Sequence, residues 1–373
     1  MTIKKKTFAI YVITKHGLAT ADKIMASMGD CDLYVSSRLF ADAPEGAIEM
    51  SLPMKKTLKE VWSQYYCHIH IISVGAVFRM TKDFLEDKKI DPAIVCVDDA
   101  ARYAISLLSG HVGKGNLYTQ QVAEAIGALP IITTASDSIG TLTVDILARD
   151  LGWSLDDESR NVTKGSADVV NACRVAFIQE TGEPQFWPLD KALPKGVEYY
   201  TALDQVEPAD FETLLIASDH EFEASNKAHW DKAVIYRPKS LVLGLGCDRD
   251  APIEVVETGM LSFLKEQNLS AKSIKAFTSV DKKADEVALI ELAKKYEVPF
   301  ITYPAEELDV VEGIENPSDV VKKHVGTRSV AEAACLLNSG ATKLLMPKTA
   351  FKLEEDGKNM TCAIARIPFD KRK

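Results

Sequence analysis

Short apolar, β-branched runs alternate with helical patterns over residues 1–135 of the chain. The runs expected to form strands lie at 8–13, 33–35, 68–74, 93–97, 105–108 and 130–133. Between them, apolar positions three and four residues apart indicate amphipathic helices, for example over 55–66 and 116–126. Because strands that alternate with helices are typical of a largely parallel sheet covered by helices, we predict an amino-terminal parallel-sheet α/β domain at 1–135.

The alternation weakens between residues 136 and 238, where Pro, Glu and Asp accumulate, and we interpret this stretch as a small middle domain that links two others. A regular pattern returns at Ser240, and Pro252 suits the first turn of the helix that follows. Further strands are expected at 274–278, 299–302, 343–346 and 361–367, and helices at 284–295 and 330–338. These elements predict a carboxy-terminal α/β domain at 239–373.

Charge changes this picture, because 44 basic and 54 acidic side chains give the chain a net charge of -10. Residues 136–238 carry 9 of the basic and 19 of the acidic groups, so the acidity belongs to the middle segment. An acidic chain is unsuited to nucleic acid, and no apolar run approaches the length of a membrane span. The seven cysteines are scattered singly. We therefore expect a cytoplasmic protein with reduced thiols and neither nucleic acid nor membrane as a partner.

The most informative motif is a buried-strand pattern from Ala104 that runs into a glycine-rich turn ending at Asn116. The turn contains Gly110, Gly113 and Gly115, and it also carries Ser109 and His111. Ligands of α/β sheets bind at such strand ends, where glycines let backbone amides approach an anion next to a helix amino terminus. In the alternative interpretation, the glycines form a tight turn and His111 is a surface residue.

Other strand ends carry polar groups as well. Thr133, Thr134 and Asp137 follow the next predicted strand, although Asp137 or Ser138 could instead cap a helix that begins near residue 140. Gly75, Arg79 and Asp98 follow two further strands of the same sheet. Arg79 is suited to a substrate carboxylate, and it could equally form a structural ion pair with Asp98.

In the carboxy-terminal domain, Gly244, Gly246 and Arg249 lie between a strand and a helix. The third glycine of a dinucleotide fingerprint is missing, since Arg249 occupies its position, so the turn indicates an anion site rather than a nucleotide site. Ser329 and Glu332 have the spacing of a helix capping box.

Several common chemistries are not indicated by the sequence. It contains no zinc-protease motif, no Walker loop and no nucleophile elbow. His68 and His70 alternate on one face of a strand and could share a metal, but no third ligand is near them in sequence, so we interpret both as structural and expect no metal site.

Taken in order, the motifs at 105–116, 133–137, 244–249 and 329–334 resemble the cobalt-precorrin-5A hydrolase family, the CbiG proteins of anaerobic cobalamin biosynthesis. The resemblance covers nearly the whole chain. Two departures stand out: Lys114 and Gly115 replace the usual Gly-Ala pair of Ser-Gly-His-x-Gly-Gly-Ala-Asn, and Asp248 reverses a charge in the usual Gly-Cys-Arg-Arg-Gly.

The resemblance implies a hydrolase that acts on a carbon-carbon bond. It would open the lactone of a cobalt-containing tetrapyrrole, release acetaldehyde and so permit ring contraction, without an external cofactor because the substrate carries the cobalt. Neighbouring pathway enzymes are further candidate partners. The implied catalytic residues are His111, Ser109 and Asp137. The residues expected to contact substrate are Gly75, Arg79, Asp98, Gly110, Gly113, Asn116, Thr133, Thr134, Gly244, Gly246, Arg249 and Ser329.

Two alternatives from other classes remain open. The chain could be a tetrapyrrole binder without catalytic activity that presents intermediates to neighbouring enzymes. It could also be a nucleotide-dependent oxidoreductase, an interpretation that depends only on the alternating strands and helices and on the incomplete glycine pattern.

Overall fold

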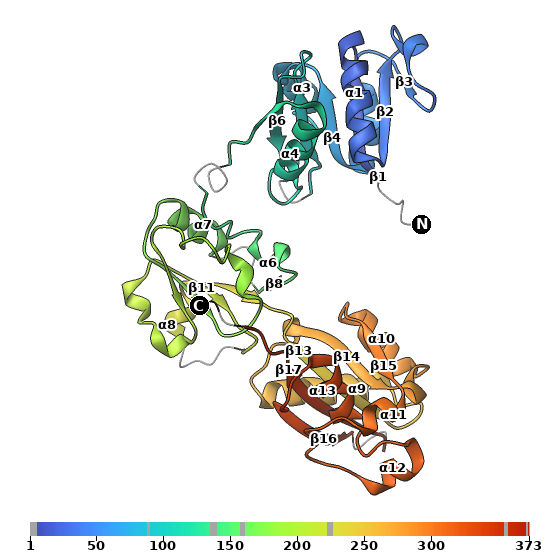
Figure 1. The fold of residues 1–373 in the computed structure, drawn as a ribbon, viewed down its shortest axis with the longest axis vertical. Helices are drawn as coiled ribbons and strands as arrows, with labels where there is room; N and C mark the ends of the chain where they lie inside the picture. The colour runs from blue at the N-terminus through green and yellow to red at the C-terminus, as the bar shows by residue number, and fades with distance from the viewer. Residues whose placement is uncertain are drawn as a thin grey trace. The chain divides into compact units, whose positions relative to one another are not determined.

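Three β-sheets make up the computed structural model, which describes residues 6–87, 90–134, 140–156, 161–221, 227–353, 357–370 and 372. They fall into two units, Met1–Gly140 with the first sheet and Thr141–Lys373 with the other two (Figure 1). No helix in these described ranges combines the length and apolar character needed to span a bilayer. All seven cysteines are unbridged.

The first unit contains a 7-stranded sheet with the strand order β3-β2-β1-β4-β5-β6-β7. Its strands are β1 (Lys6–Val12), β2 (Cys31–Ser36), β3 (Ile48–Met50), β4 (Tyr65–Ile71), β5 (Ala93–Val97), β6 (Tyr103–Leu108) and β7 (Leu129–Ile131). Its helices are α1 (Lys15–Met28), α2 (Lys55–Val61), α3 (Val74–Thr81) and α4 (Gly115–Ile126). The predicted α/β class is confirmed, and β3 is a strand that the pattern did not predict.

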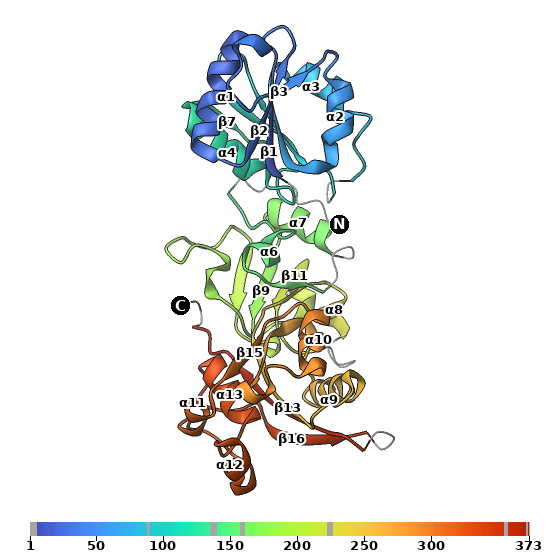
Figure 2. The same ribbon diagram turned by 90° about the vertical axis from the view of Figure 1, so that its right-hand side faces the viewer.

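Helices cover both faces of this sheet. The apolar stripes of α1 and α4 pack with Ile10 and Val12 on one face, while α2 and α3 cover the other, where Tyr11, Leu58 and Val77 are buried. Figure 2 shows the two pairs on opposite sides of the strands. Because residues of β1 alternate between two covered faces, the strand is apolar and buried from Phe8 to Val12.

The sheet is not parallel throughout, since β6 runs antiparallel to β5 and β7 is parallel to β6. Only residues 98–102 separate β5 from β6, which is too short for a parallel crossover of a dozen or more residues. As a result, the carboxyl ends of β6 and β7 lie at the opposite edge of the sheet from those of β1, β4 and β5. We call these the turn edge and the switch edge, respectively.

The middle segment contains a 5-stranded sheet of its own, in the order β10-β9-β11-β12-β8. Its strands are β8 (Ser154–Leu155), β9 (Val175–Gln179), β10 (Val197–Tyr200), β11 (Thr213–Ala217) and β12 (Ala233–Arg237), and its helices are α6 (Leu147–Asp150), α7 (Val162–Val170) and α8 (Lys227–Trp230). All strand pairs are parallel except β12 with β8. The sequence pattern predicted only a small linking domain here, not this sheet.

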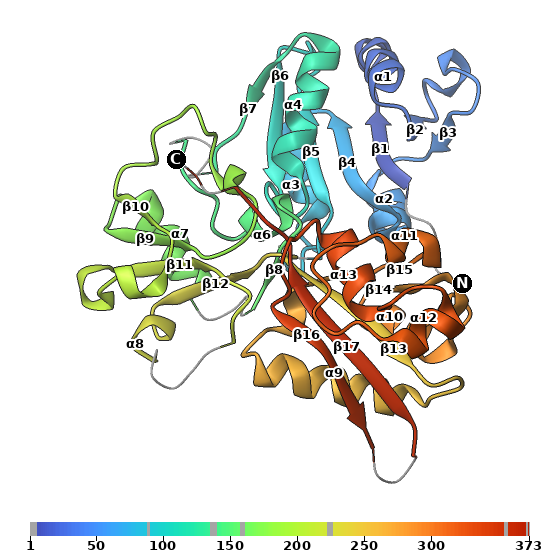
Figure 3. The ribbon, with the colours of Figure 1, turned by 60° about the horizontal axis from the view of Figure 1, so that its bottom comes forward.

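The carboxy-terminal sheet has the order β15-β14-β13-β17-β16. It comprises β13 (Leu241–Cys247), β14 (Ile274–Val280), β15 (Phe300–Tyr303), β16 (Met346–Lys352) and β17 (Asn359–Arg366), with helices α9 (Ile253–Glu266), α10 (Val287–Lys295), α11 (Ala305–Asp309), α12 (Asp319–Val325) and α13 (Ala331–Ser339). Strands β13, β14 and β15 are parallel, whereas β16 and β17 form the antiparallel pair seen in red in Figure 3. Helices α9 and α10 pack on one face and α13 on the other.

His68 and His70 lie inside a stack of aromatic rings beneath α2. His68 Nδ1 is 2.8 Å from the Tyr11 hydroxyl, while the His70 ring stacks on Tyr11 with centroids 4.7 Å apart. His70 is fully buried, and neither of its ring nitrogens has a hydrogen-bond partner among the described residues. Burial, and secondarily the charge of His68, lowers the pKa of His70 to about 3.

This neutral, buried imidazole predicts that His70→Phe stabilises the first unit. Phenylalanine keeps the ring stack and removes two unsatisfied nitrogens, so the free energy of unfolding at pH 7 should rise by about 1–3 kcal/mol. As pH falls from 6.5 towards 3, His70 becomes protonated in the unfolded wild type but stays neutral in the folded chain. The free energy of unfolding of wild type should therefore fall by a further ~1.4 kcal/mol per pH unit relative to the variant. Urea unfolding followed across this range measures both effects. A variant less stable than wild type at pH 7 would contradict the prediction.

Candidate functional site

The turn edge brings two of the predicted motifs together. Leu108 at the end of β6 pairs with Ile94 at the beginning of β5, and the Ser109 hydroxyl donates to the carbonyl of Asp91 at 3.0 Å. Thr133 and Thr134 follow β7 at this same edge because β7 is parallel to β6. The structure therefore places the Ser-Gly-His turn beside the paired threonines.

Close packing explains each glycine of the turn. A Cβ atom at Gly110 would lie 2.7 Å from Asn116 Oδ1, one at Gly113 would lie 2.6 Å from Ser109 Cβ, and one at Gly115 would lie 2.7 Å from the Leu108 carbonyl oxygen. Lys114 is the N-cap residue immediately before α4 and has a left-handed φ of 61°. The usual family sequence has glycine at that position, which fits the conformation better than lysine does.

Asn116 fastens this turn to its neighbours. Its side-chain oxygen accepts from the Ser106 hydroxyl at 2.7 Å, and its Nδ2 donates to Thr134 Oγ1 at 2.9 Å. Asn116 is buried, whereas Thr133 is exposed. These bonds let Asn116 and Thr134 hold the turn in place, so both are suited to position the site rather than to contact a substrate.

His111 lies in the middle of this turn and is partly buried. Its carbonyl accepts from the Lys114 amide at 2.9 Å, which closes the turn before α4. Asp137, the predicted partner of His111, falls outside the described residues. The pairing of the two side chains stays a prediction.

The switch edge holds Gly75, Arg79 and Asp98, so the structure does not gather them with the Ser-Gly-His turn. Strand β1 has β2 on one side and β4 on the other, and this change of direction is where α/β sheets commonly bind ligands. Arg79 is exposed and donates to the Gly75 carbonyl at 2.8 Å. Asp98 accepts from the amides of Arg102 and Tyr103 and forms an ion pair with Arg102 at 3.6 Å, so it stabilises the β5–β6 connection.

The glycines after β13 have separate roles. A Cβ atom at Gly244 would be 1.8 Å from the Ala331 carbonyl oxygen, which means that this glycine permits the close approach of α13. Gly246 faces a cavity instead. Arg249 is already paired with Asp285 at 2.8 Å and Glu286 at 3.4 Å, and it would have to exchange these partners to bind an anion.

The capping box expected at Ser329 is not formed. Ser329 is fully buried and its hydroxyl donates to Glu332 at 3.4 Å. The Glu332 carboxylate instead accepts from the amides of Asn316 at 3.0 Å and Lys348 at 2.8 Å. This buried carboxylate ties β16 and the loop that contains Asn316 to α13, which is a structural role that the sequence spacing did not predict.

The cavity beside Gly246 lies at the carboxyl ends of β13 and β14 and has a volume of about 310 Å³. Its lining includes Lys282, Lys283 and Lys348 together with several valines. Sequence reasoning missed these lysines, although two of them directly follow the predicted strand at 274–278. A pair of basic residues at that position was the available signal.

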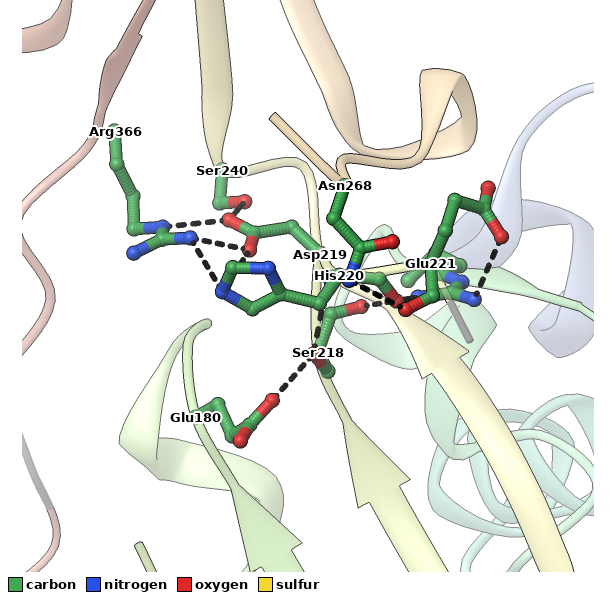
Figure 4. A network of polar contacts seen from close by, with 9 residues as sticks. Glu180, Ser218, Asp219, His220, Glu221, Ser240, Asn268 and Arg366 are labelled. Carbon is green, nitrogen blue, oxygen red and sulfur yellow. Dashed lines mark hydrogen bonds and ion pairs between the residues drawn. The ribbon is translucent and has the colours of Figure 1, made fainter. Parts of the chain in front are cut away.

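A polar network joins the middle and carboxy-terminal sheets within the second unit (Figure 4). Asp219, which follows β11 and is buried, accepts two hydrogen bonds of 2.7 Å from Arg366 and one of 2.6 Å from Ser240. His220 Nε2 lies 3.1 Å from Arg366 and must accept, because a guanidinium only donates. The network fixes the ends of β11 and β17 to each other, and sequence reasoning missed it.

Titratable groups at the carboxyl ends of the middle strands also border a cavity of about 410 Å³. Glu180, His220, Glu221 and His229 are among its lining residues. Within the described ranges, no set of three or more His, Cys, Asp or Glu side chains is arranged to hold a metal ion. The Ser218 hydroxyl donates to Glu180 at 2.6 Å, so part of this polarity is satisfied internally.

The fold and the glycine turns define a class of protein with three successive α/β sheets and glycine-containing turns at the ends of strands. Three family models match the chain in order: cobalamin synthesis G N-terminal at residues 56–137, cobalamin biosynthesis central region at 142–238, and cobalamin synthesis G C-terminus at 241–365. The chain belongs to this cobalamin synthesis G (CbiG) family, which confirms the resemblance of its motifs.

Named relatives match over almost the full length. A cobalt-precorrin-5A hydrolase of Priestia megaterium is 37% identical over 97% of this chain and 96% of its own. One from Salmonella typhimurium is 31% identical over 98% and 99%, respectively. Among solved structures, a cobalamin biosynthesis protein G homologue from Sulfolobus solfataricus aligns over 99% of this chain and 100% of its own, with 20% identity and a TM-score of 0.36.

Proposed function

We propose that this chain is a cobalt-precorrin-5A hydrolase of cobalamin biosynthesis. The observation that carries the proposal is the 37% identity to the Priestia megaterium protein of that name, which extends over 97% of this chain. A likeness of this extent includes the segments that form all three sheets. It therefore supports a shared reaction and not merely a shared domain.

In the proposed reaction, water adds to the lactone carbonyl carbon. The bond between this carbon and the ring oxygen of the lactone then breaks, which leaves a carboxylate and a hydroxyl group. Loss of the hydroxyl proton lets the adjacent carbon-carbon bond break, so that the two-carbon fragment leaves as acetaldehyde. The electron pair of that bond stays on the macrocycle and takes up a proton. The chain must therefore supply a base, an acid and donors for the developing oxyanion.

His111 is the residue that we assign to proton transfer, because an imidazole titrates near neutral pH and the turn holds it at the edge of the sheet. Asp137 is its proposed partner or a second base. Since the Ser109 hydroxyl donates its proton to the Asp91 carbonyl, we assign the oxyanion to backbone amides at Gly110 and Gly113, and Ser109 would help only if the substrate takes over that hydrogen bond. No external cofactor is needed in this scheme, because the substrate brings its own cobalt.

The substrate's peripheral carboxylates need cationic partners as well. The Arg79 guanidinium is exposed and donates a hydrogen bond to Gly75, but it lies at the switch edge, opposite the Ser-Gly-His turn, so it takes this role only if the substrate reaches that edge. Arg249 contributes only if the substrate displaces Asp285. Binding through such ion pairs should weaken as salt is added.

The proposal predicts that the purified chain converts cobalt-precorrin-5A without any added cofactor. Mass spectrometry of the tetrapyrrole should show the ring-opened, fragment-free product, cobalt-precorrin-5B. If cobalt-precorrin-5A binds to the chain but is recovered unchanged, the chain is a tetrapyrrole binder without catalytic activity. Stabilisation of the chain against heat by NAD, NADP or ATP would favour the oxidoreductase alternative.

A further inference from the structure

We propose that the cavity at the carboxyl ends of β13 and β14 binds a carboxylate-bearing edge of the tetrapyrrole, with Lys282 and Lys348 as the cationic groups. The inference rests on the proposed function and deepens it, since it assigns substrate binding to the carboxy-terminal domain. It also replaces Arg249 as the main cation of this region. Three observations support it: the apolar lining of the cavity, the hydrogen bonds of its lysines, and its position at the carboxyl ends of parallel strands.

The walls of the cavity are largely apolar. Val280, Val321, Val325, Val330 and Met360 line it, and Gly246 forms part of its base. The three valines of the α12–α13 region are only partly buried, so their methyl groups remain available to a ligand. A volume of about 310 Å³ suits one edge of a macrocycle with its side chains, not the whole ring.

The lysines supply positive charge without a carboxylate partner in the described part of the chain. Lys282 donates to the carbonyls of His324 and Val325 at 3.2 and 3.1 Å, and Lys348 donates to the Asn316 carbonyl at 2.8 Å. Lys283, by contrast, is paired with Glu286 at 2.8 Å. Backbone carbonyls orient an ammonium group but do not cancel its charge, so Lys282 and Lys348 are held in place for an anion.

One acidic side chain also lines the cavity, and it is already engaged. Asp248 accepts from the Asn359 amide at 2.8 Å and from its Nδ2 at 3.2 Å. Through these hydrogen bonds Asp248 closes the turn against β17. The cavity keeps an excess of positive charge despite it.

The cavity also lies where the topology predicts a ligand. Helices α9 and α10 follow β13 and β14 on one face of the sheet, whereas α13 covers the other face and begins at Val330 and Ala331 beside the cavity. A crevice between elements on opposite faces, at the carboxyl ends of parallel strands, is the usual ligand site of such sheets.

The test uses the full chain with two readouts and a matched control. Affinity for uroporphyrin III, a polycarboxylated porphyrin, is measured by fluorescence titration, and KM and kcat are measured with cobalt-precorrin-5A. Lys348→Gln and Lys282→Gln should each weaken uroporphyrin binding and raise KM about tenfold, with kcat changed less than about twofold. Lys348→Arg should retain most of the affinity, and Lys343→Gln, an exposed lysine that does not line the cavity, should behave as wild type.

The outcomes separate this site from the proposed function. Lysine variants that bind porphyrin and turn over like Lys343→Gln would overturn the site even if the wild type is a hydrolase. Lysine-dependent porphyrin binding by a wild type that does not convert cobalt-precorrin-5A would support the site and refute the hydrolase. Equal loss of affinity in Lys343→Gln would mean a general charge effect and would also overturn the site.

Discussion

His111→Ala should reduce the turnover of cobalt-precorrin-5A by about 10²–10⁴-fold, the usual contribution of a positioned general acid or base. The side chain lies on a turn whose shape is set by Gly110, Gly113 and Asn116, so its removal should leave the fold unchanged. Uroporphyrin affinity and the temperature of unfolding should therefore match wild type. The loss should appear in kcat, measured by acetaldehyde release.

The matched control is His16→Ala. His16 is a strongly exposed imidazole in the same unit, next to Asp99 at the switch edge. If chemistry occurs at the turn edge, this variant should turn over normally. Near-normal acetaldehyde release by His111→Ala, or a large loss in His16→Ala alone, would move the reaction to the other edge of the sheet.

Gly244→Ala should strongly destabilise the carboxy-terminal sheet. The added carbon would be 1.8 Å from the backbone oxygen of Ala331, and no side-chain rotation can relieve that contact. Either β13 or α13 must shift, at a cost of about 3 kcal/mol, the upper end for an overpacked core. The shift would also widen the cavity at the start of α13 and weaken porphyrin binding.

Thermal unfolding and hydrogen exchange of the β13 and α13 amides measure this effect. The control is Gly246→Ala, whose added carbon meets only the Thr361 hydroxyl, at 2.7 Å, and that side chain can rotate. The control should lose much less stability than Gly244→Ala. Unchanged exchange in α13 of Gly244→Ala would contradict the packing described for this helix.

Local pattern predicted most strands and helices of the outer two sheets because they have clear periods, but the strand expected at 343–346 is found at Met346–Lys352. The regular pattern was expected to return at Ser240 and β13 is found at Leu241–Cys247, while the helix expected at 116–126 is found as α4 at Gly115–Ile126. The middle sheet was missed for a physical reason. Its strands have few residues, and several connections are 3₁₀ turns such as Pro184–Phe186 and Pro208–Asp210, which carry no helical period.

The position of a motif after a strand does not show at which edge of the first sheet the motif lies. Arg79 and His111 both follow strands, yet the antiparallel β6 places them at opposite edges. The short connection at 98–102 contains the information that was needed, because a parallel crossover cannot be made in so few residues.

Three residues have roles that their spacing in the sequence does not indicate: Asp98, Ser329 and Lys282. Their roles depend on the local turn geometry or on partners distant in the sequence. Asp98 stabilises the β5–β6 connection, and Ser329 contacts the buried Glu332. Lys282 donates to a carbonyl at the end of α12. Lys282 and Lys348 are brought to one cavity only by the packing of α12 and β16. The sequence showed two lysines after a strand, but it could not show that Lys282 shares a cavity with Lys348.

The most direct test of the account is the amount of acetaldehyde released as cobalt-precorrin-5A is consumed by the wild-type chain. Acetaldehyde is quantified with alcohol dehydrogenase and NADH in samples taken after the reaction has been stopped, while absorbance follows the tetrapyrrole during the reaction. The account predicts equal amounts of acetaldehyde formed and macrocycle consumed, over many turnovers and without added cofactor. Tight binding of the macrocycle with no acetaldehyde above the enzyme-free control would contradict it.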